Sequence, residues 1–357
     1  MKSSDIASLR LLNQNLSRPD FKNPHDVVSH LGAVQAQDYA AAKWSLGLRI
    51  QNATDREVEQ AFNDGSILRT HVMRPTWHFI TPEDILWMLE LTSPRVKALL
   101  AHYDRKLELD AKLLSRCYRI ITKALRDGNN LTRAELAENL EQNKIAARGQ
   151  RLGHIVSHVE LEALICSGPR RGKQFTYALL EKRVPKVKKI RRDEALARLT
   201  LKYFTSHGPA QLKDFTWWSG LSTSDAKEGL EMVKSHLVKA SLDDKFYWFP
   251  PNAKIVQQKY QAAFLLSIFD EYTIAYKDRS ALGGERYVEK LLAMGNALTA
   301  VIILDGAIVG TWKRNLKKDK IVVIFNLFRK LSRTEENALS EAAKRYGLFL
   351  DMPVILS

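Results

Sequence analysis

Apolar residues at helical spacing occupy much of the first three quarters of the chain, and short stretches of strand-forming residues follow them. The pair Asn23-Pro24 suits the N-cap and first turn of a helix. Further helices are expected over 38–48 and 55–63, and TWHFI at 76–80 has the composition of a strand. Three helices followed by a strand are typical of a winged-helix unit.

The same order of elements returns twice along the chain. In the second copy, Thr132 and Glu135 form a capping box at the start of the middle helix. In the third copy, the sequence His207-Gly208-Pro209 ends the first helix. The helices of these two copies are expected over 113–126, 132–139, 150–165, 195–206, 211–219 and 224–237, and their strands over 175–179 and 246–249.

The last part of the chain has a different pattern, in which four short apolar stretches between residues 262 and 325 alternate with turns. Asp305-Gly306 between two of them is a strong hairpin signal. A helix is expected over 335–346. We therefore predict an α+β fold, with three tandem winged-helix domains over 1–108, 109–185 and 190–252 and a small C-terminal β-barrel over 255–357.

Composition points to the class of protein and to its partner. The chain has 357 residues, of which 45% are hydrophobic, and this is enough for several domains with buried cores. Lys and Arg number 55 against 40 Asp and Glu, which leaves a net charge of +15. Such an excess favours a polyanionic partner, and nucleic acid is the commonest one. A generally basic soluble protein is the alternative.

Several other classes of protein and site are not indicated. Cys117 and Cys166 fit no metal-ligand spacing and are expected to be buried free thiols in a reducing cytosol. The first residues have no uncharged apolar run long enough for a signal peptide, and no apolar run approaches the roughly 20 residues that span a bilayer, so we expect a cytoplasmic protein without a membrane partner. The chain also has no Walker loop, nucleophile elbow or zinc-protease motif, so we expect no metal and no cofactor.

Gln35-Ala36-Gln37, just before the helix expected over 38–48, is the strongest candidate for chemistry. Side chains two residues apart on an extended segment point in similar directions. Each amide offers an oxygen acceptor and two N–H donors, so two convergent amide oxygens can hold one water molecule. Solvated glutamines, or glutamines that merely cap the helix, are the alternative interpretation.

Four segments resemble the AlkZ-type winged-helix DNA glycosylases of the AlkZ/YcaQ superfamily. VQAQDYAAAKWSLGLR resembles the Gln-x-Gln motif, and RTHVMRPTWHFITPED, FDEYTIAYKDRS and ILDGAIVGTWKR are similar to later segments of the family in the same order. The resemblance runs from Leu11 to Pro353. Pro75 departs from it, because glycine is expected there in many relatives. The YcaQ branch has Asp as the second residue of the motif, so Gln37 favours the Gln-x-Gln branch.

The resemblance implies three winged-helix domains and a β-barrel arranged around a DNA duplex. It implies a monofunctional DNA glycosylase that repairs DNA by hydrolysing the N-glycosidic bond of N7-alkylated purines, including some interstrand crosslinks. Gln35 and Gln37 match the two glutamines that position the water in this family. We expect the protein to be a monomer and to associate with the nucleoid when it is bound to DNA.

This chemistry agrees with elementary charge considerations. A purine alkylated at N7 is positively charged, and its departure neutralises that charge, so no strong general acid is needed. The transition state resembles an oxocarbenium ion, as in glycoside hydrolysis. What remains is to orient a water and to stabilise the sugar cation, and neutral amide oxygens do both. The adjacent Asp38 is an alternative as general base.

Basic side chains at three places are candidates for DNA binding. One group flanks the strand at 76–80, one lies at a hairpin tip in the second unit, and one follows the Gly-Thr-Trp segment near the C-terminus. The alternatives are solvated charge or, for the first group, pairing with Asp64 or Glu83. The tryptophans at 77, 217 and 218 are expected in the core rather than stacked on bases. The three groups are Arg69, His71 and Arg74; Arg170, Arg171 and Lys173; and Lys313 and Arg314.

Two other functions fit the same sequence. A non-enzymatic winged-helix regulator would place a recognition helix in the major groove of DNA. A structural protein would bind another macromolecule through its basic face. Under the regulator interpretation Gln35 and Gln37 are dispensable, DNA binding is sequence-specific, and no base is released.

Overall fold

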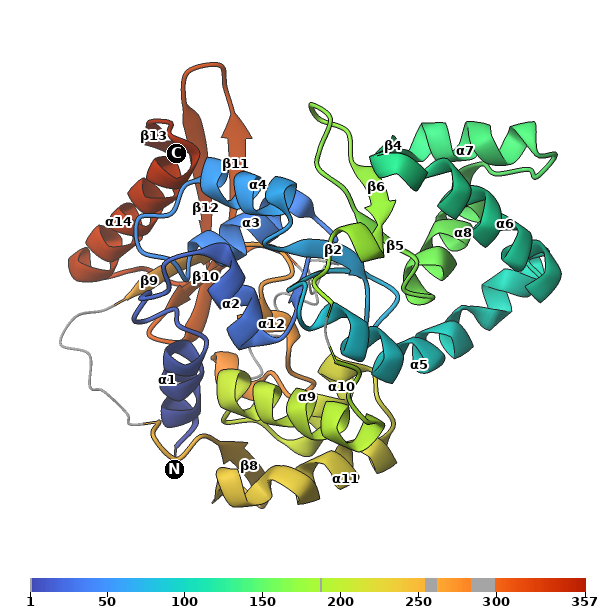
Figure 1. The fold of residues 1–357 in the computed structure, drawn as a ribbon. Coiled ribbons are helices and arrows are strands. Elements are labelled where there is room, and N and C mark those ends of the chain that lie inside the picture. Colours follow the sequence, from blue (N-terminus) through green and yellow to red (C-terminus); the bar gives the residue numbers. More distant parts are fainter. Residues whose placement is uncertain (1, 187, 254–261, 284–298) are drawn as a thin grey trace.

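A computed structural model describes residues 2–186, 188–253, 262–283 and 299–357 of the chain (Figure 1). The described residues combine helices with mainly antiparallel sheets, so the predicted α+β class is confirmed. After helix α1 (Ser3–Asn13), one order of elements occurs three times among them: a helix, a short strand, two helices and two strands. In the third occurrence a single bridge between Ala210 and Trp248 takes the place of the first strand.

The first group begins at the predicted N-cap, where the Asn23 side chain accepts a hydrogen bond from the backbone N–H of Asp26. Its sheet has the order β1-β3-β2, so the two-residue strand β1 lies at an edge. The hydrophobic pattern predicts the helices and β3, but it does not predict β1 or β2. The elements are α2 (Pro24–Leu31), β1 (Val34–Gln35), α3 (Tyr39–Gly47), α4 (Asp55–Asp64), β2 (Leu68–His71) and β3 (Trp77–Ile80).

The second group repeats this sheet as β4-β6-β5, and its capping box of Thr132 and Glu135 is confirmed. The helix predicted over 150–165 is too long. It ends at Leu161, because Ala163 adopts a left-handed backbone with φ 55° and the chain then enters a strand. The elements are α6 (Ala111–Ala124), β4 (Leu131–Thr132), α7 (Arg133–Gln142), α8 (Gly149–Leu161), β5 (Ile165–Ser167) and β6 (Thr176–Leu179).

The third group lies at the bottom of Figure 1 and contains a two-stranded hairpin. Its first helix ends at His207, as the His207-Gly208-Pro209 sequence predicts. The helix predicted over 224–237 is shorter, and its last residues form a 3-10 turn before the first hairpin strand. The elements are α9 (Arg192–His207), α10 (Leu212–Ser219), α11 (Thr223–Val233), β7 (Val238–Leu242) and β8 (Lys245–Phe249).

The C-terminal part forms a five-stranded sheet among the described residues, in the order β13-β12-β11-β10-β9. The hairpin predicted at Asp305-Gly306 is confirmed, since Leu304 pairs with Ala307 across it. The elements are β9 (Ala263–Leu266), α12 (Glu271–Ile274), β10 (Val301–Leu304), β11 (Ala307–Leu316), β12 (Ile321–Leu327), α14 (Arg333–Leu350) and β13 (Val354–Leu356).

The predicted small β-barrel is not confirmed by the described strands. Within the described residues the sheet stays open, with β9 and β13 as its two edges. Its apolar face is covered by α14 and by α3, where Tyr346 meets Trp44 and Trp312 edge-on, with ring centroids 4.9 and 5.1 Å apart. Alternating strands predict a buried face, but tertiary contacts decide whether closure or a helix covers it. Residues 254–261 and 284–298 of the predicted range lie outside the described residues.

Buried apolar side chains of the described residues form three hydrophobic cores. The first core is shared by the first group and the C-terminal sheet, and there Trp44 Nε1 donates to the carbonyl of Leu265 at 2.7 Å. The second core joins β2, β3 and α5 (Ile85–Lys106) to the third group, and the third core belongs to the second group. The predicted units at the two ends of the chain therefore meet in one core.

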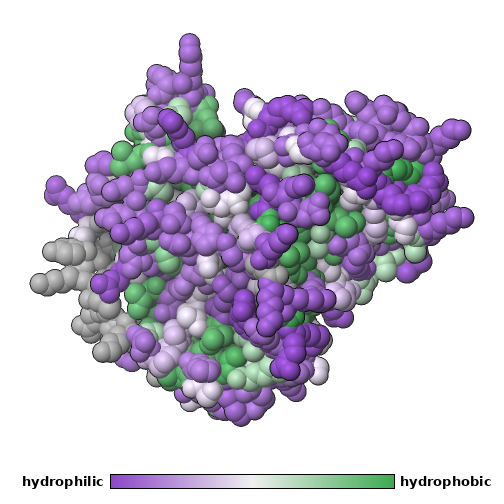
Figure 2. Space-filling view, viewed as in Figure 1, coloured by the Kyte–Doolittle hydropathy of each residue, from purple (hydrophilic) through white to green (hydrophobic). Residues whose placement is uncertain are grey.

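The surface is mainly hydrophilic on the face shown in Figure 2, with hydrophobic residues in separate patches. Cys117 and Cys166 are buried and not bonded to each other, as predicted, and burial raises the pKa of the Cys166 thiol to about 12. Among the described helices, none combines the length and the apolar character that crossing a bilayer requires.

Candidate functional site

The Gln-x-Gln segment (residues 35–37) begins at the last residue of the strand β1, and hydrogen bonds from other elements fix its backbone. The N–H of Ala36 donates to the carbonyl of Trp77 at 2.7 Å. The carbonyl of Ala36 accepts from Nε of Arg69 at 3.0 Å. Because both polar groups of the middle residue are occupied, the two glutamines on either side of it keep a defined direction.

Asp38 ends this segment and starts α3. Its carboxylate accepts a hydrogen bond from the backbone N–H of Ala41 at 2.9 Å, which is the contact of an N-cap. The carboxylate is exposed to solvent. The local structure thus accounts for an aspartate at this position without a role in catalysis.

The two glutamine side chains differ in exposure and in partners. Gln35 is half-buried, and its Oε1 accepts a hydrogen bond from Nη2 of Arg74 at 3.1 Å. Gln37 is exposed, and its Oε1 accepts from the backbone N–H of Trp77 at 3.4 Å. Each amide oxygen has two lone pairs, so each retains one for a further donor such as water.

A buried histidine holds Arg74 in place. Nη2 of Arg74 lies 3.3 Å from Nε2 of His78, while Nδ1 of His78 lies 2.9 Å from the carbonyl of Thr76. Burial, together with the charge of Arg74, holds the pKa of His78 well below its usual range. The ring is therefore neutral, donates from Nδ1 and accepts from Arg74, which is the arrangement that leaves all three groups satisfied.

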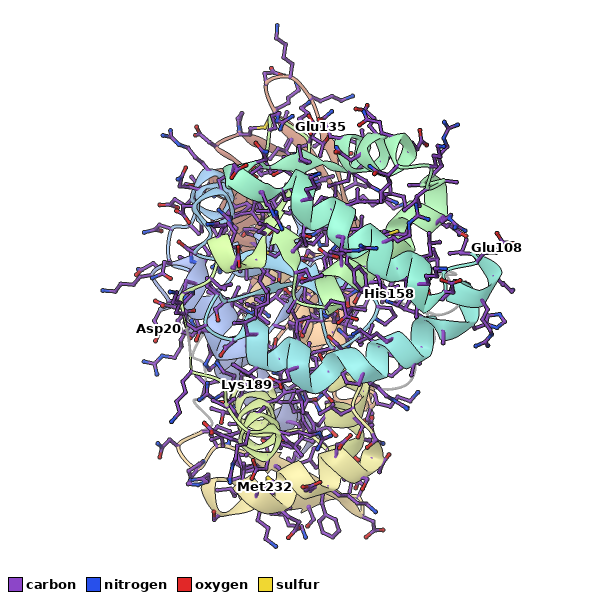
Figure 3. All side chains as sticks on the ribbon, turned by 45° about the vertical axis from the view of Figure 1, so that its right-hand side comes forward. Asp20, Glu108, Glu135, His158, Lys189 and Met232 are labelled. Carbon is purple, nitrogen blue, oxygen red and sulfur yellow. The ribbon has the colours of Figure 1, made fainter. Side chains whose placement is uncertain are left out.

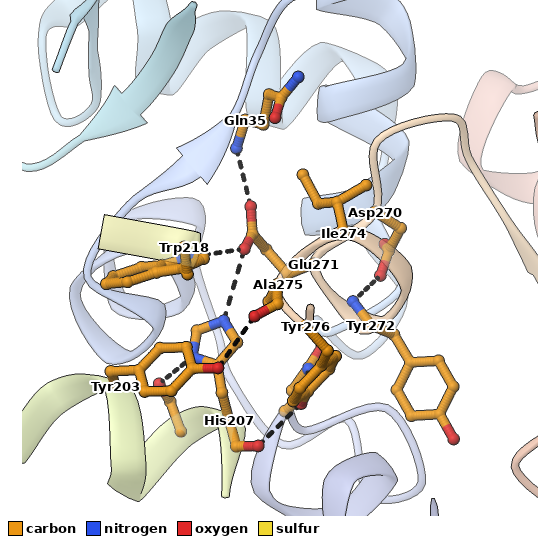
Figure 4. A network of polar contacts seen from close by, with 12 residues as sticks. Gln35, Tyr203, His207, Trp218, Asp270, Glu271, Tyr272, Ile274, Ala275 and Tyr276 are labelled. Carbon is orange, nitrogen blue, oxygen red and sulfur yellow. Dashed lines mark hydrogen bonds and ion pairs between the residues drawn. The ribbon is translucent and has the colours of Figure 1, made fainter. Parts of the chain in front are cut away.

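A carboxylate that sequence reasoning did not identify lies behind Gln35. Glu271, at the start of α12, is fully buried, and its Oε1 accepts from the backbone N–H of Gln35 at 2.9 Å (Figure 4). Its Oε2 accepts from Nε1 of Trp218 at 2.9 Å and lies 3.5 Å from Nε2 of His207. Trp218 and His207 belong to the third group. Glu271 therefore joins the edge strand β1 to the first and second helices of the third group.

The residue before Glu271 anchors α12. Asp270 accepts two hydrogen bonds from Arg49, at 2.9 and 3.0 Å, and both side chains are fully buried. Burial alone would raise the pKa of Asp270, but Arg49 and the hydrogen bonds from Ser45 and Tyr272 lower it below its ordinary value. In the sequence, these two residues are visible only as adjacent acidic residues in FDEYTIAYKDRS, a segment that resembles the family.

The first predicted DNA-binding group is mostly turned inward. Arg69 is only 8% exposed, and its guanidinium lies over the ring of Trp77, 4.3 Å from the centroid. His71 is 7% exposed, contacts Glu160 through Nδ1 and lies 3.3 Å from the hydroxyl of Ser157. The alternative partners Asp64 and Glu83 are not the ones observed. Of this group, only Arg74 contacts a glutamine side chain.

The basic hairpin tip of the second group rests on the first group. Arg170 lies between rings and donates to Glu59 of α4 at 3.3 Å, so it links two groups of the fold. Arg171 is exposed and is paired with Glu135 at 2.7 Å. Lys173 is exposed. The tip is thus only partly available to a phosphate, because Arg170 and Arg171 already have carboxylate partners.

Lys313 and Arg314 lie next to each other on β11 but face opposite sides of the sheet. Lys313 is exposed. Arg314 is half-buried, with its guanidinium 5.5 Å from the ring centroid of Tyr346, and burial lowers its pKa although Asp38 acts in the opposite direction. Lys313 is therefore the more accessible cation of this pair.

The tryptophans divide between core and surface. Trp218 is fully buried, as predicted, whereas Trp217 is 43% exposed and does not belong to the core. Trp77 is half-buried against Arg69.

The second group also holds a pair of histidines, four residues apart on α8. Asp104 contacts both of them, at 3.0 Å from Nδ1 of His154 and at 2.9 Å from Nε2 of His158. These are hydrogen bonds across the interface of α5 and α8. His158 is labelled in Figure 3. In the part of the chain that the structure describes, no group of three His, Cys, Asp or Glu side chains is placed to hold a metal ion.

Comparisons with known proteins agree with the resemblance seen in the sequence. The model of the family described as DNA glycosylase AlkZ-like matches residues 28–349. The interstrand DNA cross-link repair glycosylase of Streptomyces sahachiroi is 27% identical over 331 residues, with 88% of each chain covered. The solved structure of the Streptomyces sahachiroi DNA glycosylase AlkZ has a TM-score of 0.79 and 20% identity, covers 100% of each chain, and thus shares the fold. Because the family match spans most of its length, this chain belongs to the AlkZ-like DNA glycosylase family.

Proposed function

We propose that this chain is a monofunctional DNA glycosylase that hydrolyses the N-glycosidic bond of N7-alkylated purines in duplex DNA, with a water positioned by Gln35 and Gln37. Membership of the AlkZ-like family supports the reaction class. The name of the Streptomyces relative supports interstrand crosslinks as further substrates. We also infer that the three repeated groups are winged-helix units and that a monomer acts on the duplex.

The observation that carries the proposal is the fixed backbone of the Gln-x-Gln segment beneath two accessible amides. Ala36 is bonded through its N–H and its carbonyl, and Gln35 is bonded through its N–H to Glu271. Arg74 also fixes the rotation of the Gln35 amide. An amide held in this way orients a water without an ordering cost at the moment of reaction.

One charge next to the segment, the carboxylate of Glu271, suits a cationic transition state, whereas Arg74 and Arg69 have the opposite sign. As the alkylated base leaves, positive charge moves from the purine to the sugar. Water held by the remaining lone pairs of Gln35 and Gln37 is placed to attack the sugar carbon. Its oxygen bonds to that carbon as the bond to the purine nitrogen breaks, and the proton that the water loses passes to bulk water. The buried carboxylate of Glu271 lies behind Gln35, in surroundings where a negative charge acts over a longer distance than it does in water. The positive base departs as a neutral molecule, so no acid has to protonate it.

The reaction class is tested with a duplex that carries 7-methylguanine and with the same duplex unmodified. We expect release of 7-methylguanine and alkali-labile abasic sites in the methylated strand only. Normal guanine leaves poorly, and the proposed site, as far as the structure describes it, has no group assigned as a strong acid to assist it. Release of normal guanine as fast as 7-methylguanine would contradict the proposed selectivity. Binding of the methylated duplex without release of any base would contradict the proposed glycosylase function.

Replacing Asp38 with asparagine tests whether this side chain only caps α3 or also acts as a general base. Asparagine caps a helix as well as aspartate does, so we expect base release within about twofold of the wild type and an unchanged melting temperature. Loss of a general base would instead slow release by about a hundredfold or more. The matched variant Asp38→Ala removes the cap and should lower the melting temperature. A large loss of activity in Asp38→Asn at full stability would assign the base to this carboxylate.

The regulator interpretation gains no support from the helix that would read DNA in the second unit. Ser157, His158 and Glu160 of α8 are all buried. They contact His71 and Asp104, which belong to β2 and α5. These polar positions of α8 therefore serve the interface with the first group instead of facing a groove of DNA.

A further inference from the structure

A groove with a volume of about 710 Å³ opens on the third group, between α10, α11 and the hairpin of β7 and β8. Aromatic rings form much of its wall. Trp217 of α10 is 43% exposed and Phe246 of β8 is 54% exposed, while Trp248 is half-buried. Aromatic side chains this large are ordinarily buried, so a group of accessible rings around one groove indicates a contact surface.

The hairpin presents its rings in one direction because of strand alternation. Phe246 and Trp248 line the groove, whereas Tyr247 between them is buried on the opposite face. Lys239 stands opposite Trp248 on β7, and its Nζ lies 3.9 Å from the ring centroid of Phe246. On the other wall, Nζ of Lys277 lies 4.8 Å from the ring of Trp217. Each wall thus pairs an aromatic face with an ammonium group.

The charge of the groove is positive. Four lysines and one aspartate, Asp244, are among its lining residues. Lys213 and Lys245 are bonded to Asp278 at 3.0 and 3.1 Å. For Lys239 and Lys277, the described part of the chain contains no carboxylate at ion-pair distance, so their charges remain available. The lysines in question are Lys213, Lys239, Lys245 and Lys277.

We propose that this groove binds unpaired nucleotides of a DNA strand. Bases stack on Trp217 and Phe246, and phosphates pair with Lys239 and Lys277. A ligand that matches both features is planar, aromatic and anionic, which describes a nucleotide. Paired bases in a duplex are already stacked on each other, so their faces are open only where pairing is lost. The choice of DNA as the polyanion rests on the proposed function.

The groove is connected to the Gln-x-Gln segment through α12. Nε1 of Trp217 donates to the carbonyl of Ile274 at 3.0 Å, at the end of this four-residue helix. Glu271, at its beginning, accepts from the N–H of Gln35. Trp217 of the groove and Gln35 of the Gln-x-Gln segment therefore contact opposite ends of the same short helix.

The test measures fluorescence anisotropy of a labelled oligothymidylate of about 12 nucleotides and of a duplex of the same length, the size being typical of such sites. In the full-length protein, the double variant Trp217→Ala with Phe246→Ala is expected to weaken oligothymidylate binding by about tenfold, with duplex binding within about twofold. Met232→Ala is the matched control, because Met232 is 40% exposed on α11 of the same group but lies outside the groove (Figure 3). It should change neither affinity.

Two more variants exclude a loss caused by misfolding. Trp217→Phe with Phe246→Tyr keeps both rings and should bind oligothymidylate as the wild type does. Lys239→Gln with Lys277→Gln should reduce the slope of log affinity against log salt by about 1.4, from the loss of about two phosphate contacts at ~0.7 each.

Three results would overturn the proposal. The wild type fails to bind oligothymidylate, or the alanine double variant binds it as tightly as the wild type does. Alternatively, sedimentation shows a dimer that the alanine double variant dissociates, which makes a second copy of the chain the occupant. Gln35→Ala with Gln37→Ala keeps the groove intact and should bind oligothymidylate normally. The base-release assay therefore tests the proposed function, and oligothymidylate binding tests the groove independently of it.

Discussion

With both Gln35 and Gln37 replaced by alanine, release of 7-methylguanine from duplex DNA is expected to slow by at least about a hundredfold. The variant removes both amide oxygens that orient the water and leaves the backbone contacts of Ala36 in place. The measurement is the single-turnover rate with enzyme in excess, followed as alkali-induced strand breaks. Affinity for the damaged duplex should stay within about threefold, because neither amide carries charge.

Gln60→Ala provides the control for this double variant, since Gln60 is an exposed glutamine of α4 in the same group. It should release base at the wild-type rate. The melting temperature of the double variant should also be close to that of the wild type, because Gln37 is exposed and Gln35 is half-buried. Undiminished strand breaks in the double variant would show that Gln35 and Gln37 do not take part in catalysis. The proposed reaction class would not be affected.

Replacing Glu271 with glutamine should slow base release by about tenfold while DNA affinity stays within about twofold. The carboxylate accepts from two donors, the N–H of Gln35 and Nε1 of Trp218. A glutamine has one oxygen, so whichever way its amide turns, one donor meets an N–H₂ group. Either the N–H of Gln35 in β1 or Nε1 of Trp218 in α10 then loses its acceptor. The buried negative charge behind Gln35 is lost as well.

A purely structural role for Glu271 would give a different result. It would lower the melting temperature, and at temperatures where the variant is folded it would leave the rate at saturating enzyme unchanged. Glu271→Asp keeps the charge on a shorter side chain and should recover part of the rate. Glu138→Gln, at an exposed position of α7, is the control for a neutralised carboxylate. A wild-type single-turnover rate in Glu271→Gln would contradict the role of Glu271 in positioning Gln35.

Local patterns predicted most of the helices, because each depends on residues close together in sequence. Asn23 caps α2, Thr132 and Glu135 form their capping box, and Asp305-Gly306 makes its hairpin. The strand β1 escaped prediction, since a run of two residues is too short to show a period. The barrel stays a prediction that the described strands do not confirm, because alternation indicates a buried face and does not show what covers that face.

The candidate site divides in the same way. Gln35 and Gln37 were found from their spacing and from the resemblance of their segment to a family. Glu271 was not, because its partner Gln35 lies 236 residues away in sequence and no local pattern marks the contact. Arg69 was predicted as a DNA ligand from its charge, yet it is buried against Trp77, where its guanidinium fixes the carbonyl of Ala36.

The sequence by itself determined the secondary structure of the long helices, the basic character of the protein, its family and the two glutamines at the centre of the proposal. Only the tertiary structure decided which cations face solvent, which carboxylate supports β1, and how the C-terminal sheet is covered. The physical reason is that spacing along the chain sets local hydrogen bonds and faces. Burial and long-range polar contacts arise only when the three repeated groups and the C-terminal sheet pack together.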